Sequence, residues 1–185
     1  MVILFGLAGT GKSTHGQMLA EKFGMTWLSV GQVLRDTGEF DEILKRGELV
    51  DDDIVINLMN AKVKAVRATG RDVVLDGFPR DEYQAKWVGE HWAKDIEKAV
   101  VLEVPKEVLW QRIAERGRAD DTKEAIEKRF EIVEQNICAI LDILESKGVE
   151  ILRVSSEGEI EEAQERIERA IFSKAAEPKL PKFLR

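Results

Sequence analysis

The chain has 185 residues, with 28 Lys and Arg against 35 Asp and Glu, so its formal net charge is −7 at pH 7 with both His neutral. This length suits one domain, and a composition of 44% hydrophobic and 34% charged residues excludes wholesale disorder. The acidic balance argues against sequence-independent binding to nucleic acid, which depends on many Lys and Arg side chains.

Short apolar runs alternate with longer amphipathic stretches along the chain. The runs predict five buried strands, at residues 2–5, 26–30, 72–75, 99–104 and 150–154. The stretches between them follow a helical period, as Ile126, Phe130, Val133 and Ile137 show. This order predicts an α/β fold with a five-stranded parallel sheet, helices on both faces, and a ligand site at the carboxyl ends of the strands.

A longer segment, residues 31–70, separates the second and third predicted strands. Its pattern predicts short helices around residues 33–36 and 41–46 and a longer one over 51–68, which we expect to form a helical flap beside the sheet. The last stretch, residues 173–185, is basic, contains two Pro and has no periodicity. We expect it to form a loose tail or an irregular strap.

The single cysteine bears on compartment and on metal binding. Cys138 alone excludes an internal disulfide and a zinc site built from several thiolates, and it favours a reducing cytoplasm. No apolar stretch approaches the ~18 residues that cross a membrane, and residues 1–5 are too short for a signal peptide. We therefore expect a cytoplasmic protein without zinc and without nucleic-acid or membrane partners.

The strongest motif is a phosphate-binding loop at residues 6–13. Its sequence, GLAGTGKS, matches G-x-x-x-x-G-K-[ST] and stands between an apolar strand and a helix. In such a loop, successive backbone N–H groups surround phosphate oxygens, and the helix N-terminus adds positive potential. Lys12 is then expected to reach the β- and γ-phosphates and Ser13 to bind Mg²⁺. The sequence therefore predicts a nucleoside triphosphate site in a P-loop NTPase fold.

A second motif follows the third predicted strand, where the sequence reads DGFPR from Asp76 to Arg80. Asp76 ends the strand, where a carboxylate is placed to bind Mg²⁺ through water. Arg80 is expected to point into the same cleft as the phosphates.

A third motif is the run RGRADD at residues 116–121, which follows Arg112 and precedes Arg129. By spacing alone, Arg112 and Arg116 are equally compatible with one solvated helix face. Gly117 is expected to end one helix and Asp120 and Asp121 to cap the next, which leaves Arg118 at the tip of a tight connection.

Together these motifs resemble the adenylate kinase family of nucleoside monophosphate kinases over residues 1–172. The resemblance implies reversible, Mg²⁺-dependent transfer of a phosphoryl group from ATP to AMP, giving two ADP. It also implies one domain over residues 1–185, acting as a monomer or small homo-oligomer. That domain comprises a core (1–30, 70–112 and 122–172), an acceptor-binding insertion (31–69), a minimal lid (113–121) and the tail (173–185).

The resemblance also assigns residues. For ATP binding it implies Gly9, Thr10, Gly11, Lys12, Ser13, Thr14, Arg112, Arg116 and Gly158. For AMP binding it implies Val30, Arg35, Glu48, Leu49, Val50, Gly77, Phe78, Pro79, Arg80, Gln84, Arg118 and Arg129. Catalysis is expected from Lys12, Arg35, Arg80, Arg116, Arg118 and Arg129, with Ser13 and Asp76 at Mg²⁺.

Elementary chemistry agrees with a basic cleft that lacks a general base. The second pKa of a monophosphate lies near ~6, so the acceptor is already an oxyanion at neutral pH. Transfer then requires two polyanions to be positioned and their charge neutralised by Mg²⁺, one Lys and several Arg.

Three departures from the family pattern stand out. Val30 replaces the Thr usual in adenylate kinases and the Ala usual in UMP/CMP kinases, so the acceptor base is open. His15 replaces a Gln, and we expect it to be a helix surface residue rather than a phosphate ligand. The predicted lid is shorter than in short-lid members, with only residues 117–120 between two helices, which is expected to allow some ATP hydrolysis.

The alternatives are a UMP/CMP kinase, another small P-loop kinase such as one acting on shikimate or gluconate, and a non-catalytic nucleotide-binding module. The first two differ from adenylate kinase in acceptor, and the third predicts nucleotide binding without turnover.

Overall fold

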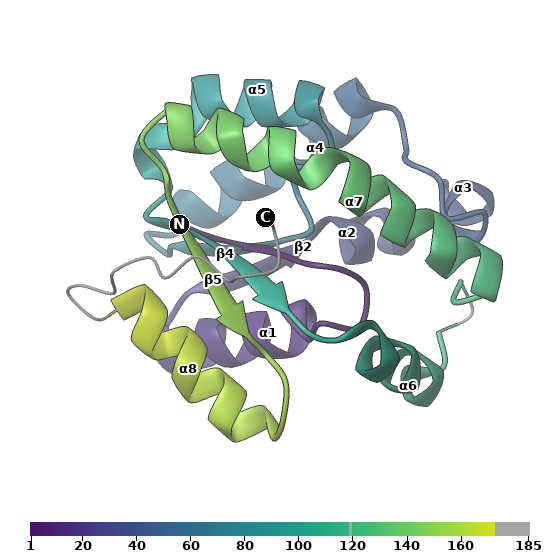
Figure 1. Ribbon diagram of the computed structural model, residues 1–185. Helices are drawn as coiled ribbons and strands as arrows, with labels where there is room; N and C mark the ends of the chain where they lie inside the picture. Colours follow the sequence, from purple (N-terminus) through teal and green to yellow (C-terminus); the bar gives the residue numbers. More distant parts are fainter. Residues whose placement is uncertain (119, 173–185) are drawn as a thin grey trace.

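The fold is a parallel β-sheet with helices packed on both of its faces (Figure 1). A computed structural model describes residues 1–118 and 120–172. In this part of the chain the strands are β1 (Val2–Phe5), β2 (Thr26–Ser29), β3 (Val73–Asp76), β4 (Lys98–Glu103) and β5 (Glu150–Ser155). They pair in parallel in the order β2-β3-β1-β4-β5. The predicted fold class is confirmed, whereas the tail at residues 173–185 lies outside the described residues.

Alternating side chains of the strands separate two layers of the core. Ile3, Phe5 and Leu75 face the layer of α4 (Asp52–Arg67), α5 (Glu82–His91) and α7 (Lys123–Ser146). Val2 and Leu4 face α1 (Lys12–Phe23) and α8 (Ile160–Phe172) on the other side (Figure 1). Because both faces of a central parallel strand are covered, these strands are apolar throughout, as the sequence indicated.

The prediction of five buried strands was wrong for the two edge strands, because three of the four residues of β2 are only partly buried and β5 has exposed residues. Glu150, Arg153 and Ser155 are exposed, and they alternate with the partly or fully buried residues between them. An edge strand has a neighbour on one side only, so part of its surface remains in water.

The predicted insertion forms three helices between β2 and β3. They are α2 (Val30–Thr37), α3 (Asp41–Lys45) and α4, close to the ranges expected from periodicity. The Asp51 side chain caps α4 by accepting hydrogen bonds from the N–H groups of Asp53 and Ile54 at 3.1 and 3.2 Å. Farther along the chain lie a 3₁₀ turn (Ala93–Asp95) and α6 (Lys106–Arg116).

The strand order indicates where along the carboxyl ends of the strands a ligand binds. From β1 the chain builds β2 and β3 on one side and then crosses to β4 and β5 on the other. In open α/β sheets, ligands bind at the carboxyl ends of the strands where this reversal occurs. No helix in the described ranges has the length and hydropathy needed to cross a membrane.

Candidate active site

The phosphate-binding loop leaves β1 and enters α1 as the sequence predicted. Gly11, the N-cap of α1, has φ 86°, a left-handed conformation that residues with a side chain rarely adopt. Lys12 is the first residue of α1, and its Nζ donates to the carbonyl oxygens of Gly6 and Leu7, each at 2.8 Å. Burial, together with the nearby Arg80, Arg116 and Arg118 and against the opposing effect of Asp76, lowers the pKa of Lys12 to about 8. The loop therefore carries a desolvated cation at its centre.

Ser13 and Asp76 meet beside this lysine. Asp76 is the last residue of β3 and pairs in register with Leu4 of β1, so its carboxylate lies next to the loop. The Ser13 hydroxyl donates to Asp76 Oδ2 at 2.8 Å, and Asp76 is buried. A hydroxyl and a carboxylate at this spacing are oxygen ligands of the kind that Mg²⁺ prefers. The residues present therefore fit a magnesium site.

A cavity opens from this point toward the insertion and α7. Eleven of the residues assigned by the resemblance line it: Lys12, Ser13, Arg35, Leu49, Asp76, Gly77, Pro79, Arg80, Arg116, Arg118 and Arg129. They come from the loop, the insertion, the end of β3 and the elements around residues 116–129. The tertiary structure thus gathers four distant segments of the chain around one space.

Arg80 is a strongly desolvated cation among the residues that the resemblance assigns to AMP binding. Burial lowers the pKa of Arg80 to about 10, and Arg129 and Arg35 add to this effect while Asp76 opposes it. Its Nε donates to the Gly77 carbonyl oxygen at 2.9 Å. Several positive charges thus face one cavity, an arrangement suited to binding anions.

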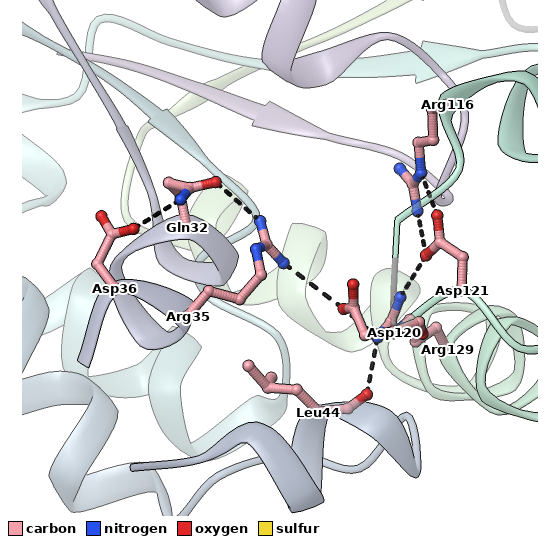
Figure 2. A network of polar contacts seen from close by, with 8 residues as sticks. All are labelled: Gln32, Arg35, Asp36, Leu44, Arg116, Asp120, Asp121 and Arg129. Carbon is pink, nitrogen blue, oxygen red and sulfur yellow. Dashed lines mark hydrogen bonds and ion pairs between the residues drawn. The ribbon is translucent and has the colours of Figure 1, made fainter. Parts of the chain in front are cut away.

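Two aspartates hold part of this positive charge in place (Figure 2). Asp121 accepts two hydrogen bonds from Arg116, at 2.5 and 2.7 Å, and one from Arg129 at 3.0 Å. Asp120 pairs with Arg129 at 2.7 Å and lies 3.7 Å from the Arg35 guanidinium. Asp120 is buried and the side chain of Asp121 is only 4% exposed, so the arginines are oriented by ion pairs that water screens weakly.

The prediction that Asp120 and Asp121 cap the helix after the lid was therefore wrong. Thr122 caps α7, its hydroxyl accepting from the Ala125 N–H at 3.2 Å. Helix α7 begins at Lys123, so residues 117–122 connect it to α6, a longer separation than the predicted 117–120. A carboxylate next to two guanidinium groups gains more from pairing with them than from capping a helix.

Arg129 also ties the insertion to α7. Its Nη2 donates to the Leu44 carbonyl oxygen, the last-but-one residue of α3, at 2.8 Å (Figure 2). The apolar residues Ile132, Val133 and Ile137 of α7 continue the cavity wall from there. Sequence reasoning missed Leu44, these apolar residues and both aspartates. For Val133 and Ile137 the available signal was their place in the apolar helical pattern of α7.

On the side assigned to ATP, Arg112 and Gly158 come together. The Arg112 guanidinium donates to the Ser156 carbonyl oxygen from both Nη atoms at 3.1 Å, and Nη2 lies 3.4 Å from the Gly158 carbonyl oxygen. Residues 156–158 follow the edge strand β5, so these hydrogen bonds connect α6 to the chain segment that leaves this edge of the sheet. Thr14 is exposed on α1, whereas Thr10 is buried.

Other assigned residues do not line the cavity. Val30, Val50 and Phe78 are buried in the core. Glu48 is bound to Arg46 at 3.0 Å and to Lys128 at 2.9 Å. Gln84 is buried, donating to Asp52 at 2.8 Å and accepting from the Arg80 N–H at 2.9 Å.

The expectation that His15 is a surface residue was wrong. His15 is 3% exposed, and its Nδ1 lies 2.9 Å from Oε1 of Gln164 on α8. Burial lowers the pKa of His15, so the ring stays neutral at neutral pH. The helix surface predicted at this position is covered by α8.

One carboxylate at the edge of the site yields a pH-dependent prediction. Asp81 caps α5 by accepting the Gln84 N–H at 2.9 Å. Burial raises the pKa of Asp81 from 3.8 to about 6, and the neighbouring Asp52 carboxylate also raises it. A raised carboxyl pKa means that ionised Asp81 costs stability above pH 6, while below pH 4 both folded and unfolded chains are protonated and the cost vanishes.

We expect Asp81→Asn, which retains a capping side chain, to stabilise the protein at pH 7.5 by about 1 kcal/mol after allowance for solvent screening. Thermal unfolding at pH 7.5 and pH 4 measures this. Equal melting temperatures for the variant and the wild type at pH 7.5 would contradict it.

Comparison with known proteins matches the chain to a family model described as adenylate kinase over residues 4–149. The chain is 33% identical to an adenylate kinase of Synechococcus sp. (strain WH7803), over 92% of this chain and 97% of that protein. It is 31% identical to an adenylate kinase of Stenotrophomonas maltophilia (strain R551-3), covering 92% and 98%. For an adenylate kinase of Prochlorococcus marinus (strain MIT 9211), the identity is 30% and the coverage 92% and 96%.

Proposed function

Since the chain belongs to the adenylate kinase family, we propose that it transfers the γ-phosphoryl group of Mg²⁺-bound ATP to AMP, giving two ADP. It is a nucleoside monophosphate kinase. The observation that supports this most directly is that one cavity is lined both by Lys12, Ser13 and Asp76 and by Arg35, Arg80 and Arg129. Transfer of a phosphoryl group between two nucleotides requires binding sites for both of their phosphates within one cavity.

The phosphate loop and Lys12 are proposed to bind the β- and γ-phosphates of ATP. Lys12 would exchange its contacts with the Gly6 and Leu7 carbonyl oxygens for phosphate oxygens. Gly9, Thr10, Gly11 and Thr14 would contribute the backbone of this site, and Arg112, Arg116 and Gly158 its base and phosphate contacts. Ser13, with Asp76 through water, would hold the Mg²⁺, which neutralises negative charge on the phosphates when bound.

The arginines opposite the loop are proposed to bind the AMP phosphate and the transferring group. Arg35, Arg80, Arg118 and Arg129 all line the cavity, and they would surround the transferring group, where negative charge is greatest. Because the AMP phosphate is already ionised at neutral pH, these residues orient it and no side chain has to remove a proton. The remaining acceptor residues, from Val30 and the 48–50 segment to Gln84, would enclose ribose and base.

The finer properties are proposed from composition. One cysteine and a net charge of −7 support a cytoplasmic enzyme without zinc and without nucleic-acid or membrane partners. A monomer or small homo-oligomer fits its size.

An acceptor panel tests the proposal. The purified chain is incubated with ATP and Mg²⁺ and with AMP, CMP, UMP or GMP in turn, while nucleoside diphosphate formation is followed. We expect AMP to be the best acceptor. A preference for CMP or UMP would make it a UMP/CMP kinase, and binding of ATP without transfer to any acceptor would make it a nucleotide-binding module.

The same assay without an acceptor tests the consequence of the short connection between α6 and α7. Helix α6 ends at Arg116 and α7 begins at Lys123, so only a short segment is available to cover the phosphates, and water should reach the γ-phosphoryl group more easily than under a long lid. We expect measurable release of inorganic phosphate from ATP, dependent on Mg²⁺. Hydrolysis indistinguishable from a Lys12→Met control would contradict this.

A further inference from the structure

Three buried polar side chains lie behind the phosphate loop, on the side away from the cavity. They are His15 on α1, Gln164 on α8 and Ser156 in the connection between β5 and α8, and they are 3%, 4% and 1% exposed. Buried polar groups persist when they are hydrogen-bonded, because an unpaired one costs free energy. None of the three is used in the reaction proposed above.

The orientation of the His15 ring is set by a chain of contacts between α1 and α8. Lys22 Nζ donates to Glu168 at 2.6 Å, and the Gln164 amide nitrogen donates to the same carboxylate at 2.9 Å. The Gln164 oxygen therefore faces His15, whose Nδ1 must carry the proton that this oxygen accepts. The other edge of the ring, Cδ2 and Nε2, is thereby directed toward the loop.

That edge lies directly against Gly11. A Cβ atom on Gly11 would be 3.0 Å from His15 Cδ2 and 3.1 Å from Nε2, so the ring occupies the space beside the glycine. The backbone N–H of His15 also donates to the Gly11 carbonyl oxygen at 2.9 Å. The His15 ring therefore blocks Gly11 from moving toward it and leaving the left-handed conformation.

Ser156 acts on the preceding residue. Its hydroxyl donates to the Thr10 carbonyl oxygen at 2.8 Å in a buried contact. Its own carbonyl oxygen accepts a hydrogen bond from each of the two Nη atoms of Arg112. One residue thus joins the phosphate loop to the arginine assigned to the ATP base.

We propose that His15 and Ser156 are positioning residues for ATP, holding the Thr10–Gly11 segment of the phosphate loop from behind. This inference rests on the proposed function, since it presumes that the loop binds the phosphates of ATP. The direction of the backbone N–H groups after Gly11 depends on the conformation of this segment, and phosphate binding requires them to converge. The His15 ring of α1, held by Gln164 of α8, and the Ser156 hydroxyl in the connection before α8 fix that conformation before ATP arrives.

The test compares ATP and AMP kinetics in His15→Asn, Ser156→Ala and the double variant. Asn retains a donor near the Nδ1 position but has no ring edge to place against Gly11, and Ala removes one hydroxyl. We expect each single variant to raise KM for ATP about tenfold, while KM for AMP changes less than about twofold and kcat falls less than KM rises. Calorimetric titration of ATP without acceptor is expected to show a matching rise in Kd.

Matched controls are His91→Asn, at the exposed C-terminal end of α5, and Ser146→Ala, at the exposed end of α7. These are expected to leave both KM values unchanged. In the double variant the effects should not multiply, because both contacts restrain adjacent residues of one loop.

Equal increases in both KM values, or unchanged ATP affinity in Ser156→Ala, would overturn the inference. Should His15→Asn fail to fold, Ser156→Ala alone decides, since it deletes a single atom beyond Cβ. A wild-type chain that does not phosphorylate AMP would instead overturn the proposed function, and an active wild type with unaffected variants would overturn the positioning inference alone.

Discussion

Replacing Arg80 with methionine is expected to lower kcat about 10³-fold, equivalent to about 4 kcal/mol of transition-state stabilisation, without destabilising the fold. The guanidinium lies in the cavity between the end of β3 and the arginines of the insertion and α7. It is therefore placed to neutralise charge on the transferring group, which a methionine of similar length cannot do. The substitution should lower the rate of phosphoryl transfer far more than it lowers the stability of the fold.

The stability half of this prediction follows from electrostatics. Burial and the nearby Arg129 and Arg35 lower the pKa of Arg80 to about 10, which means that its charge is less favourable in the folded chain than in water. Removing that charge relieves repulsion and offsets the lost contact with the Gly77 carbonyl oxygen. The melting temperature without nucleotide is expected to equal or exceed that of the wild type, as at other sites where function is maintained at the expense of stability.

Steady-state kinetics and thermal unfolding of Arg80→Met measure the two halves. Arg71→Met, an exposed substitution just before the other end of β3, is the control and should change neither. A fall in melting temperature of more than roughly 4 °C would show that Arg80 is needed for the fold, and unchanged kcat would remove it from the reaction.

Replacing Asp121 with asparagine is expected to have the opposite effect on stability. The side chain of Asp121 is 4% exposed and compensates two guanidinium groups, those of Arg116 and Arg129. Loss of one partner of a buried ion pair leaves uncompensated charge, which costs about 3 kcal/mol. For a chain of this length the melting temperature should fall by roughly 6–12 °C.

The pH dependence of this loss has a defined sign. Burial raises the pKa of Asp121, but the hydrogen bond and charge of Arg116, with Arg129 and Arg118, outweigh burial and hold the pKa below its ordinary value of 3.8. A lowered carboxyl pKa contributes stability above the unfolded value that is lost as pH falls through the folded one. The difference between wild type and Asp121→Asn should therefore be full at pH 7 and shrink below pH 4.

Thermal unfolding across this pH range measures the effect, and Asp142→Asn, on the exposed face of α7, is the control. Inorganic phosphate should restore part of the lost stability at pH 7, because an anion between Arg116 and Arg129 replaces the missing charge. Equal stability of variant and wild type at pH 7 would contradict the role assigned to this carboxylate.

Local pattern was sufficient for the sheet and for the phosphate loop. Residues 2–5 form a strand, residues 12–23 form a helix, and the glycine-rich turn between them has the conformation that its residue types require. Such features depend on hydrophobic periodicity and on the backbone preferences of residues a few positions apart, and both can be read directly from the sequence. The insertion helices were predicted for the same reason.

Side-chain partners were decided by the tertiary structure. Asp121 is of a residue type that commonly caps helices. It pairs instead with Arg116 and Arg129, because the start of α7 packs beside the end of α6. His15 had the spacing of a surface residue but is covered by α8, whose Gln164 is 149 positions away. The packing of α1 against α8 on one face of the sheet decides which of their side chains meet. No pattern within a few residues of the chain reveals such a contact. The sequence by itself therefore determined the elements and the glycine-rich loop between β1 and α1, whereas packing decided which charges are paired and which are left facing the cavity.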